Sequence, residues 1–362
     1  MLKKNKKILS VITATLVMAL GISFTNVQAA SIKRMNGIDK VDTANKTAKE
    51  IFQKSESVIL VNGKAYADAV SAAPFSRLIN APILLTDNKG ALESSVLQTI
   101  NDLQNVKKIY IVGGTAVVST NIENSLKSKG FQVIRYDGQK YNDQTRYGTN
   151  ARIAEEILKL NPNSKTGILV NGQDGYADAL SVASIAATNG YPVLFGNRKD
   201  VPNVVKNNII SKNKLQILAV GGSFVLPSSV VSSVNGKKIT QDKDAINRFQ
   251  TNLAVIEYFK GKGGLDFSNI YVAAGGQGGE AGKFQFADAL VASAAAAKTG
   301  SPLVLSGLGA GTTEIENAEK FIETNIEAEG NLIIVGGSAV VSDSIEEKLY
   351  DKVADFTVVE IS

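Results

Sequence analysis

One short motif occurs three times in this chain at a constant interval, and this recurrence constrains the fold more than any other feature. The motif returns every 110 residues, as Tyr66-Ala67-Asp68-Ala69, Tyr176-Ala177-Asp178-Ala179 and Phe286-Ala287-Asp288-Ala289. Fourteen residues after each aspartate stands a proline that opens an apolar run: Ile83-Leu84-Leu85, Val193-Leu194-Phe195 and Leu303-Val304-Leu305. A glycine pair follows 29 to 34 residues after each proline, as Gly113-Gly114, Gly221-Gly222 and Gly336-Gly337. This period is too long for a solenoid repeat and fits a small domain, so the sequence predicts three tandem copies of one module.

The amino terminus has the pattern of an export signal. A basic start with Lys3, Lys4, Lys6 and Lys7 precedes an apolar stretch over residues 8–24, and Val27-Gln28-Ala29 supplies small residues around a cleavage site. We expect residues 1–29 to be a cleaved signal peptide; the alternative is an uncleaved anchor just long enough to span a bilayer. No later stretch has the length and apolar character of a transmembrane helix, so we expect a secreted chain with no transmembrane anchor after cleavage.

Charge and composition exclude several classes of function. The chain has 39 basic and 34 acidic residues, but four of the lysines lie in the predicted leader, which leaves a mature chain of net charge +1. Net charge therefore does not favour nucleic acid as a partner, and any anion binding must come from local geometry. Cysteine and histidine are both absent. This excludes disulfides, cysteine nucleophiles and the usual histidine-ligated zinc of amidases, and we expect no metal and no cofactor.

The order of elements within a copy predicts an α/β fold. In the first copy we expect strands over residues 57–63, 83–86, 108–112 and 131–136, and helices over residues 43–54, 68–78, 91–103 and 120–129. The last of these opens on Thr120-Asn121-Ile122-Glu123, which reads as a capping box. Short β-branched runs that alternate with helices indicate a mainly parallel sheet with helices on both faces, as in a Rossmann-like domain. The predicted copies cover residues 30–135, 136–240 and 241–362, and we expect no further domain after the third.

These motifs resemble the cell-wall-binding repeat type 2 family of clostridial and related Gram-positive surface proteins. The resemblance rests on Thr145-Arg146-Tyr147-Gly148-Thr149, on the segment from Gly172 to Ala183, on the proline-led run and on Val-Gly-Gly. It implies truncated Rossmann- or Toprim-like domains packed about a pseudo-threefold axis. It also implies non-covalent attachment to the wall through an anionic polysaccharide, such as a secondary wall polymer or a teichoic-acid-like chain. The first copy departs from the opening motif, since Lys40 stands where the others have Arg146 and Arg248, and only Ile83-Leu84-Leu85 matches the family's apolar run.

The recurring residues have a structural and a functional interpretation. Each aspartate is expected in the first turn of a helix, where it caps free N–H groups and pairs with a nearby cation. The sharper hypothesis is that it positions a loop that touches ligand. The apolar runs are expected to be central strands of a buried sheet, with any effect on attachment indirect. The small-sided helix after each aspartate is expected to pack tightly on the sheet or on a sister copy. As polymer-binding or repeat-core candidates we therefore take Lys40, Asp68, Ile83, Leu84, Leu85, Gly113, Gly114, Arg146, Asp178, Val193, Leu194, Phe195, Gly221, Gly222, Arg248, Asp288, Leu303, Val304, Leu305, Gly336 and Gly337.

The loop before each aspartate differs between copies. From the glycine at the strand end to the aromatic residue the interval is three residues in the first copy, four in the second and eleven in the third. Ligand loops lie at this edge of parallel sheets, so the copies are expected to present different surfaces, although a neutral insertion is an equal alternative. The glycine-rich stretch over residues 276–283 resembles dinucleotide and P-loop motifs incompletely, and we reject both.

The sequence therefore predicts a non-catalytic protein that binds an anionic wall polysaccharide through three weak contacts acting together. Helix N-termini after the first and third strands, with nearby Lys or Arg, are the expected anion sites. One alternative is a structural surface-layer or adhesin subunit that uses the same anchor and joins other surface proteins. Another is a wall hydrolase of the amidase type, for which the sequence offers no catalytic residues. The expected location is the cell wall or cell surface.

Overall fold

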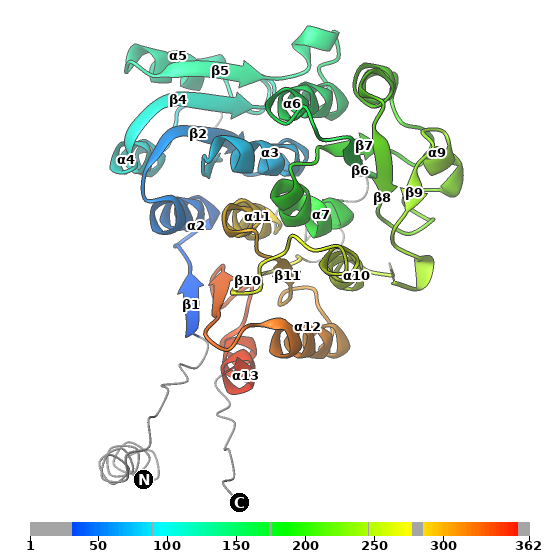
Figure 1. Cartoon of the computed structure of the whole chain (residues 1–362). Coiled ribbons are helices and arrows are strands. Elements are labelled where there is room, and N and C mark those ends of the chain that lie inside the picture. Colours follow the sequence, from blue (N-terminus) through cyan, green and yellow to red (C-terminus); the bar gives the residue numbers. More distant parts are fainter. Residues whose placement is uncertain (1–30, 88–89, 174–175, 245, 277–284, 354–362) are drawn as a thin grey trace, which may run out of the picture.

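The chain forms three parallel sheets of four strands each, with helices on both faces, which confirms the predicted α/β fold (Figure 1). The computed structural model describes residues 31–87, 90–173, 176–244, 246–276 and 285–353. The predicted signal peptide and the glycine-rich stretch after residue 276 lie outside the described residues. Each sheet gathers the strands of one sequence copy, with one exception at the amino terminus.

The first copy builds a sheet of order β3-β2-β4-β5. Its strands are β2 (Ser55–Asn62), β3 (Ile83–Thr86), β4 (Gln104–Val112) and β5 (Gln132–Tyr136). Its helices are α2 (Lys40–Thr47), which continues as the π-helical turn η2 (Ala48–Phe52), α3 (Tyr66–Ile79), α4 (Ser94–Asp102) and α5 (Thr120–Ser128).

The second copy repeats this order as β7-β6-β8-β9. Its strands are β6 (Thr166–Asn171), β7 (Val193–Gly196), β8 (Gln216–Ala219) and β9 (Lys237–Lys238). Its helical elements are η3 (Gln139–Tyr141), α6 (Arg146–Leu160), α7 (Tyr176–Asn189), α8 (Asn203–Val205), η4 (Lys206–Ser211) and α9 (Ser228–Ser232).

The third sheet has the order β1-β12-β10-β11, and its outer strand comes from the other end of the chain. Its own strands are β10 (Asn269–Ala273), β11 (Leu303–Leu305) and β12 (Asn331–Val335), and the helical elements are η5 (Asp242–Asp244), α10 (Arg248–Lys260), α11 (Ala287–Thr299), α12 (Thr312–Asn325) and α13 (Asp343–Val353). The fourth strand is β1 (Ser31–Met35), which runs parallel to β12 with Ser31 opposite Asn331. The amino-terminal strand thus takes the place that β5 and β9 take in the other sheets.

The side chains of β1 reproduce the contacts of β5. Arg34 donates through Nη1 to the carbonyl of Gly336 at 2.9 Å and through Nε to Glu346 at 2.9 Å. Arg135 makes the same two bonds, to the carbonyl of Gly113 and to Glu123, both at 2.8 Å. Strand β1 therefore resembles β5 both in its backbone pairing and in the contacts of its arginine, and it occupies the same position in the third sheet that β5 occupies in the first.

The helix after each first strand packs against its two counterparts at the centre of the molecule. These central helices are α3, α7 and α11, and all three contact one another around a pseudo-threefold axis (Figure 1). Their contact faces are rich in alanine and serine, which lets the backbones approach closely, and α11 buries Ala294, Ala295, Ala296 and Ala297. The expectation that the small-sided helices pack on sister copies is therefore correct.

The first helix of each copy crosses to the central helix of the preceding copy. Helix α6 packs on α3, α10 on α7 and α2 on α11. A hydrogen bond joins each pair: Asn150 Nδ2 to Ser71 Oγ at 3.0 Å, Ser181 Oγ to the Arg248 carbonyl at 3.2 Å, and Lys298 Nζ to the Ile51 carbonyl at 2.9 Å. We call these contact regions the first seam (copies one and two), the second seam (copies two and three) and the third seam (copies three and one).

Two local predictions need correction. Helix α5 is capped by Ser119, whose side chain accepts from the Ile122 amide, and not by Thr120; Glu123 turns away to pair with Lys127 and Arg135. The apolar runs are buried as expected, but they form β3, β7 and β11, which are edge strands of their sheets. They are shielded because the first helix of each copy packs over them.

Candidate functional site

The three recurrent aspartates lie directly beneath the recurrent glycine pairs. Each occupies the first turn of its central helix, and each places a carboxylate oxygen against the first glycine of the pair that follows the third strand. A Cβ atom on that glycine would lie 2.7 Å from Oδ2 of Asp68 or Asp178 and 2.9 Å from Oδ2 of Asp288. The glycines have φ values of +123°, +122° and +120° and are, in copy order, Gly113, Gly221 and Gly336. Both the backbone and the carboxylate therefore require glycine, and this contact explains why the two motifs recur together in every copy.

The second glycine of each pair has a different role. A Cβ on Gly114 or Gly337 would meet nothing within 4 Å. In the second copy the carbonyl of Gly222 accepts from the amides of Val225 and Leu226 and so starts the next turn. Packing therefore does not require glycine at this second position, and there is open space beside the loop.

Each aspartate faces a cation from the next copy, in cyclic order. The charge of Arg146 acts on Asp68, that of Arg248 on Asp178 and that of Lys40 on Asp288. Burial dominates in every case and raises the pKa of Asp68 to about 7 and that of Asp178 and Asp288 to about 6, while the cations pull these values down. The sequence predicted the two sets of residues but not that each pair joins two copies.

A cleft of about 500 Å³ opens at the first seam. We call it the first cleft. Its walls come from the start of α3, the turn after β4, the start of α6 and the loop after β6, and are made of Lys64, Ala65, Tyr66, Ala67, Asp68, Gly114, Ala116, Val117, Gln144, Thr145, Arg146, Thr149 and Gln173. A second hollow of about 240 Å³ shares Gly114, Ala116 and Gln144 with it, so the two form one groove that continues toward Asp137. The carboxyl ends of the parallel strands, where open α/β sheets bind ligands, supply its floor.

Arg146 and Tyr66 form the polar centre of the first cleft. Arg146 Nη1 donates to Tyr66 Oη and to the carbonyl of Gly172, both at 2.8 Å, and Tyr66 Oη donates to the same carbonyl at 2.6 Å. The guanidinium carbon lies 5.4 Å from the centre of the Tyr66 ring. Arg146 is exposed, and both of its hydrogen bonds are made by Nη1 to neutral oxygens, so the rest of its donor fork can face solvent. Such an arrangement binds an oxyanion by charge-assisted hydrogen bonds.

The counterparts of Arg146 have other partners. Arg248 Nη1 donates to the carbonyls of Gly275 and Gly276, at 2.7 and 2.8 Å, beside a hollow of about 230 Å³ within the third copy. Lys40 Nζ lies 3.0 Å from Oδ2 of Asp87, which follows β3. The three cation positions therefore share a place in the repeat but not an electrostatic setting.

The apolar runs lie apart from the clefts. All nine of their side chains, from Ile83 to Leu85, Val193 to Phe195 and Leu303 to Leu305, are no more than 2% exposed. Their place is the core between the sheet and the first helix of each copy. Their burial agrees with the expectation that they belong to the core of each copy.

Sequence reasoning missed two asparagines, each of which is hydrogen-bonded to one of these edge strands. Asn150 donates to the carbonyl of Val193 at 2.7 Å and accepts from the amide of Phe195 at 3.0 Å. Asn252 holds Leu303 and Leu305 in the same way, at 2.9 and 2.8 Å. The signal was present, because each asparagine follows the basic residue of its copy by four positions. In the first copy that position is Ala44.

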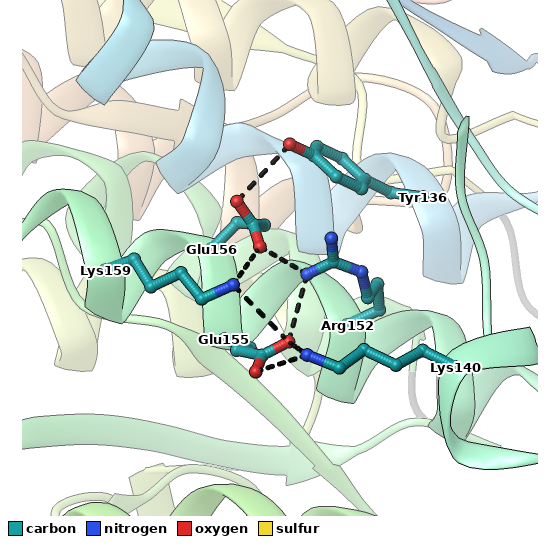
Figure 2. A network of polar contacts seen from close by, with 6 residues as sticks. All are labelled: Tyr136, Lys140, Arg152, Glu155, Glu156 and Lys159. Atoms are coloured by element: carbon teal, nitrogen blue, oxygen red, sulfur yellow. Dashed lines mark hydrogen bonds and ion pairs between the residues drawn. The ribbon is translucent and has the colours of Figure 1, made fainter. Parts of the chain in front are cut away.

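A network of charged side chains on α6 and on the residues before it also contacts β5 (Figure 2). Arg152 pairs with Glu155 at 3.0 Å and also with Glu156, and its guanidinium lies 4.7 Å from the ring centre of Tyr136 on β5. Burial acts to raise the pKa of Glu156, but hydrogen bonds from Lys159 and Arg152 outweigh it and hold that pKa below its usual range. The network thus joins β5 of the first copy to α6 of the second, away from the first cleft. Its members are Tyr136, Lys140, Arg152, Glu155, Glu156 and Lys159.

No described helix combines the length and the apolar character needed to cross a membrane. Among the same residues, no three or more histidine, cysteine or acidic side chains gather as a possible metal site.

Two curated relatives from Bacillus subtilis (strain 168) match nearly the whole chain. The N-acetylmuramoyl-L-alanine amidase LytC is 30% identical over 328 residues, which is 91% of this chain and 60% of the relative. The amidase enhancer is 25% identical over 328 residues, again 91% of this chain but 41% of the relative. The chain therefore spans only about half of the length of these relatives.

Two solved structures from Clostridium difficile share the fold, and a family model matches the sequence three times. Cwp8 superposes with a TM-score of 0.75 at 26% identity and covers 98% of this chain and 56% of its own. Cwp6 gives 0.71 at 25% identity, with coverage of 91% and 49%. The model of cell wall binding domain 2 (CWB2) matches residues 34–123, 141–231 and 245–346. Because these three tandem matches take in most of the chain, it belongs to the CWB2 family.

Proposed function

We propose that this protein binds an anionic cell-wall polysaccharide non-covalently and without catalysis, through the three copies bounded at residues 30–135, 136–240 and 241–362. In this proposal the segment 1–29 exports the chain, and the polymer is a secondary wall polymer or a teichoic-acid-like chain. Family membership and the likeness to Cwp6 and Cwp8 support cell-wall binding at the wall or cell surface. The groups that line the first cleft support an anionic polymer, and the lack of histidine and cysteine in the chain supports a role without catalysis.

The first cleft is the observation that carries the proposal. It combines an exposed guanidinium, a lysine and several amide and hydroxyl groups along a groove, which are the groups that recognise an oxyanion and sugar hydroxyls. It does not present a stacking platform of several aromatic rings, and tryptophan is absent from the chain. Recognition by charge and hydrogen bonds is thus favoured over sugar stacking.

In this proposal the N-termini of the central helices contribute little to anion binding. The central helices start with Asp68, Asp178 and Asp288, whose side chains lie in the first turn where an external anion would otherwise bind. The cations of the neighbouring copies therefore carry most of the attraction for a polyanion in this proposal.

A test compares walls before and after the anionic polymer is stripped. We expect the purified protein to sediment with intact walls and to stay in the supernatant with stripped walls. Retention should fall steadily with added sodium chloride, because exposed cations and anions are screened within about 10 Å at 0.1 M salt. Equal retention on both kinds of wall would contradict the proposal.

A wall hydrolase is the second candidate, because one relative is an amidase by name. The chain has no histidine and no cysteine. We therefore expect no release of soluble wall fragments when the protein is incubated with purified walls, with an active amidase as positive control.

A further inference from the structure

The three seams repeat one arrangement, yet their charge balance differs. In each, the sequence places an aromatic residue at the start of the central helix and a cation at the start of the first helix of the next copy. Tyr66 meets Arg146 at the first seam, and the corresponding pair at the third seam is Phe286 and Lys40. Phe286 has no hydroxyl to hold the cation or to donate to a ligand, although its ring packs against Tyr66 at 5.7 Å.

An acidic residue after the apolar run marks the first copy alone. Strand pairing aligns Asp87 with Asn197 in the second copy and Gly307 in the third, because β3, β7 and β11 pair with their neighbours in the same register. Asp87 lies 3.0 Å from Lys40, whose side chain is 19% exposed. In the second copy, the position that corresponds to Asp87 is the neutral Asn197. Among the described residues Arg146 makes no salt bridge, and the acidic group on which its charge acts is the buried Asp68. Lys40 acts in the same way on the buried Asp288 and in addition forms a salt bridge with Asp87.

The first cleft gains a further cation from its loop. Lys64 stands two residues before Tyr66 and lines the same cavity as Arg146. In the third copy Gln285 and Phe286 occupy the end of the corresponding loop. Two cations therefore line the first cleft, and among its described lining residues the only carboxylate is Asp68, whose burial raises its pKa to about 7.

From these differences we infer that the seams are unequal. The first cleft is the principal subsite for an oxyanion on a saccharide unit, and the ion pair with Asp87 weakens the attraction of Lys40 for an anion at the third seam. This inference rests on the proposed function and names the part of the molecule that performs it. The oxyanion is a phosphate or a carboxylate, since both fit the free part of the Arg146 fork.

The experiment uses matched variants of the full chain. Arg146→Gln and Lys40→Gln remove the cation at equivalent positions. Asp87→Asn removes the negative charge that pairs with Lys40 and keeps the side chain at position 87 nearly the same size. Binding to intact walls is measured as apparent Kd at fixed ionic strength. We expect Arg146→Gln to weaken binding roughly tenfold, as the loss of a charge-assisted hydrogen bond implies. Lys40→Gln should stay within about twofold of the wild type, and Asp87→Asn should tighten binding severalfold.

Several outcomes overturn the inference. It fails if Lys40→Gln weakens binding as much as Arg146→Gln, or if Asp87→Asn leaves the Kd unchanged. Arg146→Lys separates charge from geometry: it should restore only part of the affinity, because lysine lacks the planar fork. Thermal unfolding of each variant guards against loss of the fold, and only variants that unfold within a few degrees of the wild type are compared.

Two controls separate this inference from the proposed function and identify the anion. If the wild type binds stripped walls as well as intact ones, the proposed function itself fails; if it discriminates but the variants behave alike, only the inference fails. Competition with glycerol phosphate and with glucuronate, each against sodium chloride of equal ionic strength, distinguishes a phosphate from a carboxylate. The competitor that fits should displace the wild type and have no extra effect on Arg146→Gln.

Discussion

At the level of single residues, each recurrent aspartate and the first glycine of the pair that it contacts form one structural unit. The glycine backbone has φ near +120°, a region that residues with a Cβ rarely adopt, and the carboxylate fills the space that a Cβ would need. The pair accounts for two of the three recurrent motifs through one contact. It is a structural requirement of the repeat and not by itself a ligand site.

Gly113→Ala tests this pairing. The new methyl would lie 2.7 Å from Asp68 Oδ2 and 2.7 Å from a Val117 methyl, so the variant combines strain with a clash. We expect a loss of about 2 kcal/mol or more in the free energy of unfolding, measured with urea. Gly114→Ala is the control, because its Cβ meets nothing within 4 Å, and it should change stability by less than about 0.5 kcal/mol. Similar losses in both variants would contradict the assignment.

The buried carboxylates give the fold an unusual pH dependence. Burial raises the pKa of Asp68 to about 7, and the charge of Arg146 only partly offsets this. The folded state then binds more protons than the unfolded state between about pH 4 and pH 7, so the free energy of unfolding falls as pH rises through this window. Asp178 and Asp288, with pKa values raised to about 6, act in the same direction.

Asp68→Asn should flatten this dependence. Asparagine cannot ionise, so its Tm should fall less than that of the wild type between about pH 5 and pH 8, by an amount that corresponds to about 2–4 kcal/mol. Calorimetry above pH 5 isolates the effect, because the paired Glu123, Glu155 and Glu156 have lowered pKa values and lose their contribution only at lower pH. Asp351→Asn, at an exposed position, is the control. Parallel Tm curves for Asp68→Asn and the wild type would count against a buried, titrating Asp68.

At the level of elements, the first helix of a copy holds the outer edge of its own sheet. An edge strand has unpaired amides and carbonyls, and Asn150 and Asn252 satisfy one of each on β7 and β11. The first copy has Ala44 at this position and Asn45 one residue later. Both polar atoms of the Asn45 side chain are buried without a partner. An asparagine thus stabilises the second and third copies, whereas the buried asparagine of the first copy has unsatisfied polar atoms that cost stability.

Two alanine substitutions should therefore act in opposite directions. Asn150→Ala leaves the Val193 carbonyl and the Phe195 amide unsatisfied in the core, which costs about 2–3 kcal/mol. Asn45→Ala removes two unsatisfied polar atoms and should be neutral or stabilising. Urea unfolding of both variants in the same buffer measures the difference. A larger loss for Asn45→Ala than for Asn150→Ala would show that the described contacts do not govern stability here.

The local elements could be predicted from the sequence because their signals are local. The strand predicted over residues 83–86 has the same bounds as β3. The helix predicted over residues 68–78 corresponds to α3, which begins two residues earlier, at Tyr66. The pairing of Asp68 with Arg146, by contrast, depends on packing between copies and has no short-range signature. The same holds for β1, whose partner strand β12 lies 300 residues away along the chain. The sequence fragment around Arg34 does resemble that around Arg135, but a five-residue likeness is too weak to assign a strand across the molecule.

At the level of the whole molecule, β1 gives the three seams the same chain connectivity. The chain passes from β5 into α6 at the first seam and from β9 into α10 at the second. With β1 in the third sheet, it also passes from that sheet into α2 of the first copy. Every seam is therefore crossed by a strand-to-helix connection, and the ring closes about its axis (Figure 1). Without β1, the third seam would depend on side-chain packing alone.

Removal of residues 30–36 should open the third seam selectively. The truncation deletes the parallel pairing of β1 with β12 and the bonds of Arg34 to Glu346 and to the Gly336 carbonyl. We expect faster amide hydrogen exchange in β12 and in the packed helices α2 and α11, because the opening free energy of a segment falls when its contacts are lost. Exchange in β4, which keeps β5 as its neighbour, should stay close to that of the full chain and serves as the internal control. Uniformly faster exchange would indicate global destabilisation, and unchanged exchange in β12 would show that the third sheet does not depend on the amino-terminal strand.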